Sequence, residues 1–422
     1  MLLTPRTSSA LLLLLARPLL ASSDLGHTEI CGPGASLFSP GGPVCLTDSR
    51  DLGGEDSDQP ICVFTDTSFA EGRGISLITA PQRANYLATS PAFAEPDTVK
   101  SINQDLNQTP PTKYEMREIP GKGMGLIATA HILRGDLIMA NTASLMIDYR
   151  AFNELSKPQY TALQAHAVDH LPPLHRSLFL NLSAHTPSTS HLTHAELVDA
   201  IAATNGFDID PDDDDADQHN SFFVIFPSIA RMNHDCRPNA EYRFDHPTLS
   251  QSIHAARDIA PGEELTLSYI NPLLSRAQRL AKLQRNWGFA CGCPLCTVDD
   301  ARARESDARI AQIAKLREEL RDWGRGERSR ACPEMAELLV GLYEMERLWG
   351  TMHEAYTLAA LEYNAAGDPW TAVKYARMGV EWGIPMLGEG DEDVRELRRL
   401  AEDPWEHWSW ERRLRERGEN AA

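Results

Sequence analysis

The order of apolar and polar positions changes near residue 112, where short strand-like patterns begin. KYEMREI (113–119) alternates in polarity, and LIATA (126–130) and DLIMAN (136–141) are two further short apolar runs. The glycine-rich segment GKGMG (121–125) separates the first two. Alternation of this kind, interrupted by turn-forming residues, is typical of short β-strands. This part of the chain is therefore predicted to form small sheets.

Helical spacing of apolar residues appears in two other regions. The first covers about 150–205, where Thr193 precedes Glu196 by three residues, as in a capping box. The second runs from about 300 to 422 and breaks at Trp349-Gly350 and at Gly367-Asp368-Pro369. This rhythm resembles antiparallel helix pairs of the tetratricopeptide kind. We therefore expect an α+β fold with a helical insert, followed by an all-α domain.

The first 111 residues show little periodicity. Residues 1–23 carry Arg6, a leucine-rich apolar run and no acidic residue, as in a secretory signal or a mitochondrial presequence. A misassigned translation start would explain the segment equally well. Residues 24–111 are rich in Gly, Pro, Ser and Asp and are predicted to be mostly irregular, although ISLIT (75–79) reads as a strand.

The net charge of the chain limits the classes of partner that it is expected to bind. The 422 residues carry a formal net charge of -20, which argues against a broad basic face for nucleic acid or anionic membranes. The acidic run 208–220 is predicted to be a solvated insertion, with attraction of a basic substrate as the lesser alternative. No apolar stretch is long enough to span a bilayer. We expect a monomer with two or three domains.

Four of the eight cysteines suggest a metal site. Cys291, Cys293 and Cys296 follow the spacing C-x-C-x-x-C, and Cys236 lies in a comparable polar loop. A tetrahedral all-cysteine zinc site needs four thiolates at one point, so these four are predicted to bind zinc. The alternative is a set of buried or disulfide-bonded cysteines. Cys31, Cys45, Cys62 and Cys332 receive no role, although a secreted protein could pair them.

Three further motifs are weak when taken singly. GKGMGLIA (121–128) is a glycine-spaced turn that does not open a helix, so it is no dinucleotide fingerprint. RMNHDCRPNA (231–240) contains the residues of an ordinary loop, and a cysteine nucleophile there would conflict with zinc binding by Cys236. GEELTLSY (262–269) reads as a strand that ends in Tyr269.

The order of these motifs is more specific than any one of them. The glycine turn, RxNHxCxPN, GEELTxSY and the cysteine cluster together resemble the SET-domain lysine methyltransferases. The spacing is most similar to the SET-and-MYND subgroup without its MYND finger, and to the fungal SET domain-containing protein 5 group. The resemblance implies a SET domain over 112–270 and a zinc-bound post-SET segment over 271–297. Asp235 departs from the family's usual serine.

The resemblance also implies roles for individual residues. Tyr269 would be the active-site tyrosine. S-adenosylmethionine would bind a pocket built by Lys122, Gly123, Met124, Asn205, Asn233, His234, Tyr269, Trp287 and Phe289. Asn233 and His234 would hold its amino-acid end and adenine, while Trp287 and Phe289 would pack on the adenine and form a wall of the lysine channel. The cluster of Cys236, Cys291, Cys293 and Cys296 would bind a structural zinc.

The implied reaction is methyl transfer to a lysine of a protein, either a histone or a non-histone substrate. The chemistry is mainly alignment of a neutral lysine nitrogen with the methyl group, which a narrow aromatic channel favours by lowering the lysine pKa. Two alternatives stand beside it. One is a catalytically weak interaction module that uses the helical domain, and the other is a secreted protein with disulfide-bonded cysteines. The resemblance favours the nucleus or cytoplasm, and residues 1–23 favour secretion or mitochondria.

Overall fold

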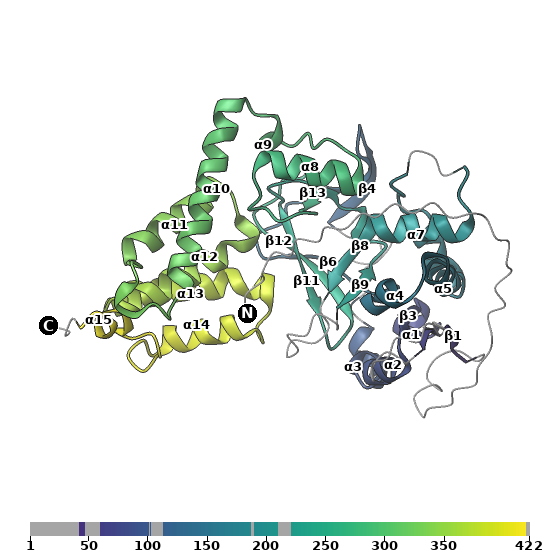
Figure 1. Ribbon diagram of the computed structural model, residues 1–422, viewed down its shortest axis with the longest axis horizontal. Helices are drawn as coiled ribbons and strands as arrows, with labels where there is room; N and C mark the ends of the chain where they lie inside the picture. The colour runs from purple at the N-terminus through teal and green to yellow at the C-terminus, as the bar shows by residue number, and fades with distance from the viewer. Residues whose placement is uncertain are drawn as a thin grey trace.

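The computed structural model describes residues 42–46, 60–100, 102, 113–186, 190–209 and 221–418. They form a strand-rich body and a separate lobe of helices at the C-terminal end (Figure 1). The expectations for residues 1–23, for Cys31 and for the acidic run beyond residue 209 lie outside these residues.

The strands of the body lie in three sheets. The largest has the order β1-β2-β3-β7-β9-β8, with β1 (Val44–Leu46), β2 (Ile61–Asp66), β3 (Ile75–Thr79), β7 (Leu145–Asp148), β9 (Phe222–Ile225) and β8 (Gly206–Ile209). The second has the order β10-β13-β5-β4, with β10 (Asn233–His234), β13 (Glu264–Leu267), β5 (Gly123–Ala128) and β4 (Tyr114–Ile119). The third has the order β11-β12-β6, with β11 (Ala240–Asp245), β12 (Ser250–Ala255) and β6 (Leu137–Thr142). Short strands in small sheets confirm the predicted α+β organisation.

Residues 60–100 are more ordered than the sequence suggests. β2 and β3 pair as a hairpin, and β3 then pairs in parallel with β7, through Ser76–Leu145 to Ile78–Ile147. This differs from the expectation of a mostly irregular region over 24–111. The partner of β3 lies about 70 residues along the chain, and a local pattern carries no information about such a pairing. Cys45 and Cys62 form a disulfide between β1 and β2.

Both faces of the six-stranded sheet are covered. On one face, Ile61, Ile78, Leu145 and Ile147 pack against helices that include the predicted insert. These helices are α4 (Tyr149–Glu154), α5 (Lys157–Asp169), α6 (Pro173–Leu180) and α7 (His194–Asn205). The capping box of Thr193 and Glu196 is present at the start of α7.

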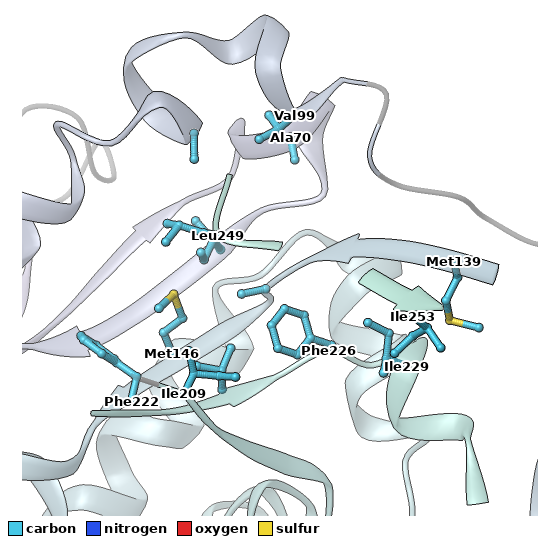
Figure 2. Close-up of a cluster of buried hydrophobic side chains, with 14 of the residues drawn as sticks. Ala70, Val99, Met139, Met146, Ile209, Phe222, Phe226, Ile229, Leu249 and Ile253 are labelled. Atoms are coloured by element: carbon cyan, nitrogen blue, oxygen red, sulfur yellow. The ribbon is translucent and has the colours of Figure 1, made fainter. Parts of the chain in front are cut away.

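The opposite face joins the main core of the body. Met146 and Phe222 from this sheet lie in one cluster with Met139 and Ile253 of the β6–β12 sheet (Figure 2). The short helices α1 (Phe69–Gly72), α2 (Pro81–Leu87) and α3 (Pro91–Ala94) close the end of this cluster. Because each buried aliphatic or aromatic side chain contributes roughly 1.5–3 kcal/mol, this shared core fixes the sheets relative to one another.

Helices make up most of the described residues from 276 to 418. α8 (Arg276–Trp287) and α9 (Pro294–Thr297) lead to α10 (Asp300–Arg321), α11 (Pro333–Met345), α12 (Met352–Ala365), α13 (Pro369–Leu387), α14 (Glu392–Glu402) and α15 (Arg412–Glu416). The last six form one lobe with its own core (Figure 1), and the predicted breaks fall between α11 and α12 and between α12 and α13. Among the described residues, we find no helix with the length and apolarity needed to cross a membrane.

Candidate active site and metal cluster

A cavity of about 550 Å³ lies where the β4–β5 hairpin, the end of α7, β10 and the segment after α8 meet. Most of the predicted cofactor residues line it, namely Lys122, Met124, Asn205, Asn233, His234, Tyr269, Trp287 and Phe289. Gly123 lies in the wall between Lys122 and Met124 but is not among the lining residues. The structure thus brings together residues that are up to 167 positions apart in the chain.

Glycines allow the β4–β5 hairpin to approach the cavity. Gly121 and Gly123 have φ angles of 77°, which a residue with a side chain rarely adopts. Gly125 has a different role, because a Cβ atom there would lie 2.7 Å from Nδ2 of Asn233 and 3.2 Å from Oε1 of Glu264. Its missing side chain gives those two groups the space to meet.

Asn233, Glu264 and Lys122 form one network beside the cavity. Asn233 Nδ2 donates to Glu264 Oε1 at 2.9 Å and to the Met124 carbonyl at 3.3 Å. Lys122 Nζ donates to the other carboxylate oxygen of Glu264 at 2.6 Å. Glu264 lies within the GEELT motif, but the sequence resemblance assigns it no role.

The ring of His234 lies in the cavity wall between Tyr269 and the cysteines. Its Nδ1 accepts a hydrogen bond from the Tyr269 backbone N–H at 3.1 Å, so the ring proton must be on Nε2, which lies 3.3 Å from Cys236 Sγ. Burial lowers the pKa of His234 to about 4, and the ring is therefore neutral at physiological pH. With both ring nitrogens engaged, the His234 side chain supports the loop.

Tyr269 lies at the centre of an aromatic wall. Its hydroxyl donates to the Met232 carbonyl at 2.7 Å, and its ring lies 5.3 Å from that of Trp287. Burial raises the pKa of Tyr269 above its usual value, so the side chain stays a neutral phenol. Because the hydroxyl proton is used toward Met232, the oxygen lone pairs remain able to accept from an amine.

The end of α7 and the segment after α8 are tied together at this wall. Trp287 Nε1 donates to the Thr204 carbonyl at 3.0 Å. Asn205 Nδ2 donates to the carbonyls of Ser183 and Ile201, both at 2.7 Å. These bonds fix the amide of Asn205 and the indole of Trp287 at the cavity edge.

The four predicted metal ligands converge. The Sγ atoms of Cys236, Cys291, Cys293 and Cys296 all lie within 4.8 Å of one another, and all four residues are buried. Cys236 Sγ is 3.9 Å from that of Cys291 and 3.5 Å from that of Cys296. A tetrahedral ion with metal–sulfur bonds of 2.3 Å requires sulfur–sulfur distances of about 3.8 Å. The cluster therefore fits a four-coordinate metal.

The loop that carries Cys236 is anchored to the helical lobe. The backbone N–H of Arg237 donates to Asp235 Oδ1 at 2.8 Å, so Asp235 closes a local turn. The Arg237 guanidinium binds the buried carboxylate of Glu346 at 2.8 Å. Glu346 also accepts from Ser306 at 2.8 Å and from Arg309 at 2.6 Å. One buried carboxylate at the end of α11 thus joins the cysteine loop to α10.

The chain matches the family model of the SET domain over residues 123–270. These residues form a SET domain. Three of the four sequence motifs lie in or overlap these residues, and the fourth, the cysteine cluster, begins at Cys291, 21 positions after the matched residues end.

Curated relatives of the SET domain are lysine methyltransferases. Histone-lysine N-methyltransferase set5 of Schizosaccharomyces pombe is 32% identical over 203 residues, which are 48% of this chain and 56% of that protein. N-lysine methyltransferase SMYD2-B of Danio rerio is 36% identical over 94 residues, 22% of this chain and 20% of that protein. Histone-lysine N-methyltransferase SMYD3 of Homo sapiens is 38% identical over 79 residues, 19% of this chain and 18% of that protein. The chain spans about half the length of the first of these relatives and less of the others.

Proposed function

We propose that this protein transfers a methyl group from S-adenosylmethionine to a lysine side chain of another protein. The observation that carries the proposal is a single cavity in which the hairpin, Asn233, Tyr269 and Trp287 meet beside four clustered cysteines. The names of the relatives support the same reaction, for histone or other protein substrates.

The residues of the cavity suit a reaction that depends on alignment. S-adenosylmethionine, when bound, supplies a methyl group on a positively charged sulfur. The acceptor lysine must lose its proton, and the partly buried aromatic walls of Tyr269, Trp287 and Phe289 favour the neutral amine. The Tyr269 oxygen, held by its bond to Met232, can then accept from that amine and orient its lone pair. No covalent intermediate on the protein is needed.

We also propose that the four cysteines hold a structural zinc ion. Four thiolates fill a tetrahedral site and leave no position for a substrate. The ion would connect Cys236 of the SET domain to the segment that carries Phe289 and so complete the cavity wall. Nε2–H of His234, which points to Cys236 Sγ, would donate to the ligating thiolate and stabilise its charge.

A methyl-transfer assay on the full chain tests this function. Labelled S-adenosylmethionine is incubated with histones and, separately, with a cell lysate. We expect incorporation by the wild type and a loss of roughly a hundredfold in Tyr269→Phe, the size typical of removing one transition-state contact. Tyr86→Phe is the matched control, because Tyr86 is 62% exposed and does not line the cavity.

Two results would contradict the proposal. Equal incorporation by the wild type and Tyr269→Phe would remove Tyr269 from the reaction. Failure of the folded wild type to bind S-adenosylhomocysteine by calorimetry would remove the methyl donor, and would favour a SET fold used only for protein interaction.

A further inference from the structure

Glu264 lies at the start of β13 and accepts from two groups that line the cavity. One carboxylate oxygen binds Asn233 Nδ2 at 2.9 Å and the other binds Lys122 Nζ at 2.6 Å. The Glu264 side chain is 17% exposed, while Lys122 retains 39%. The carboxylate therefore lies behind its two partners, and the partners face the open space.

The two acceptors around Asn233 fix which way its amide points. A carboxylate oxygen and the Met124 carbonyl both accept and neither donates, so the amide group facing them must be the NH₂. The amide oxygen then becomes the atom that Asn233 offers to a ligand. The absence of a side chain at Gly125 is part of this arrangement, because a Cβ atom would displace the NH₂ group.

Lys122 adds a positive charge that is held by the same carboxylate of Glu264. Its ammonium has three N–H bonds, of which the contact with Glu264 uses one. Lys122 lines the cavity together with Asn233. A cation and an acceptor oxygen, held by one carboxylate, complement the carboxylate and ammonium of an amino acid.

We propose that Glu264 is the positioning residue for the amino-acid end of the methyl donor. It orients the Asn233 oxygen toward the donor's α-ammonium group and holds Lys122 for the donor's α-carboxylate. Glu264 itself touches neither the donor nor the lysine substrate. This inference rests on the proposed function and adds to it the residue that orients Asn233 and holds Lys122.

Replacement of Glu264 by glutamine should reverse the orientation of the Asn233 side-chain amide. The glutamine oxygen is drawn to the Lys122 ammonium, so its NH₂ group faces Asn233. Two NH₂ groups repel, and Asn233 therefore turns its oxygen toward the glutamine and its NH₂ toward the cavity. An NH₂ group there faces a ligand ammonium unfavourably.

Two ligands separate this role from a general structural one. S-adenosylhomocysteine has the amino-acid end, and 5′-methylthioadenosine has the same nucleoside and sulfur without it. Calorimetry on the full chain should show that Glu264→Gln weakens the first by about tenfold or more, as expected for one lost charged hydrogen bond. The dissociation constant of the second should stay within about twofold, since it has no group facing Asn233.

Glu263→Gln is the matched control. Glu263 precedes Glu264, binds Arg257 at 2.7 Å on the exposed surface and is 36% exposed. It should change neither dissociation constant. Equal weakening of both ligands by Glu264→Gln, or no change in either, would overturn the inference.

The outcomes for the two proposals are distinguishable. A wild type that binds neither ligand contradicts the proposed function. A wild type that binds both ligands equally well contradicts only the inference that the protein recognises the amino-acid end of the donor. Should Glu264→Gln fail to fold, Lys122→Met tests the exposed end of the same ion pair. Selective loss of S-adenosylhomocysteine binding would support the inference, and equal loss for both ligands would overturn it.

Discussion

Single residues decide how closely the SET domain strands approach the cavity. Gly125 is the clearest example, since a Cβ atom would lie 2.7 Å from both Asn233 Nδ2 and a side-chain carbon of Ile119. We expect Gly125→Ala to cost about 1–3 kcal/mol of folding free energy by overpacking, and to weaken S-adenosylhomocysteine binding about tenfold or more by displacing Asn233.

Calorimetry and thermal unfolding check this prediction against Gly292→Ala. Gly292 lines the cavity, but a Cβ atom there meets nothing within 4 Å. The control should retain wild-type affinity and stability. An affinity unchanged in Gly125→Ala would show that Asn233 does not need its observed position.

The sequence predicts which residues gather at the cavity because their motifs occur in a recognised order. It does not reveal how their polar atoms are paired. Glu263 and Glu264 are adjacent and chemically identical, yet one faces Arg257 and the other faces Asn233. Glu264 is the first residue of β13, where pairing with Ile127 of β5 fixes its register, whereas Glu263 lies just before the strand.

At the scale of elements, the segment from Gly288 to Thr297 depends on its cysteines. Its buried residues are Cys291, Cys293 and Cys296, which cluster with Ile270 and Leu283. Such a short stretch buries too little apolar surface to fold alone, so its order should require a metal.

We expect the purified protein to contain about one zinc ion per chain. Cys296→Ser should lose most of this zinc, measured by plasma mass spectrometry, and should also lose S-adenosylhomocysteine binding because Phe289 is no longer held. Cys332→Ser, outside the cluster, is the control and should keep its zinc. Full zinc occupancy in Cys296→Ser would contradict four-cysteine coordination.

Element prediction succeeds where the signal is local and fails where the partner is distant. The capping box of Thr193 and the breaks near Trp349 and Gly367 are visible in a few neighbouring letters. By contrast, β2 becomes part of a sheet through β3, and β3 through β7. The residues near Ile61 contain no local pattern that indicates these strand partners.

The whole molecule is held together in part by the buried pair of Arg237 and Glu346, whose side chains are 9% and 2% exposed. Breaking a buried pair from one side leaves an uncompensated charge and typically costs about 3–5 kcal/mol. We expect a loss of that size in Glu346→Gln, measured by urea unfolding. Glu263→Gln should cost about 0–1 kcal/mol, because its ion pair is exposed. A loss below about 1 kcal/mol in Glu346→Gln would show that this pair does not stabilise the contact between the Cys236 loop and the helical lobe.

The Glu346 carboxylate should also make the folding stability depend on pH in the acid range. Burial alone would raise the pKa of Glu346, but hydrogen bonds from Arg237, Ser306 and Arg309 outweigh it and leave the pKa below its usual value. A depressed folded-state pKa stabilises the protein above the ordinary carboxyl range, and this stability is lost as the pH falls through the folded value. Glu346→Gln should therefore show a shallower loss of stability in acid than the wild type.

The cysteine cluster also sets an order of events during synthesis on the ribosome. Cys236 and Cys291 are separated by 55 positions, which at 5–20 residues per second is about 3 to 11 s of translation. Throughout that interval Cys236 is a lone thiol without its three companions. A chain that stops before Cys296 would carry Tyr269, Trp287 and Phe289 but only three of the four clustered cysteines, so the cavity wall would be complete in sequence before it could be fixed in place.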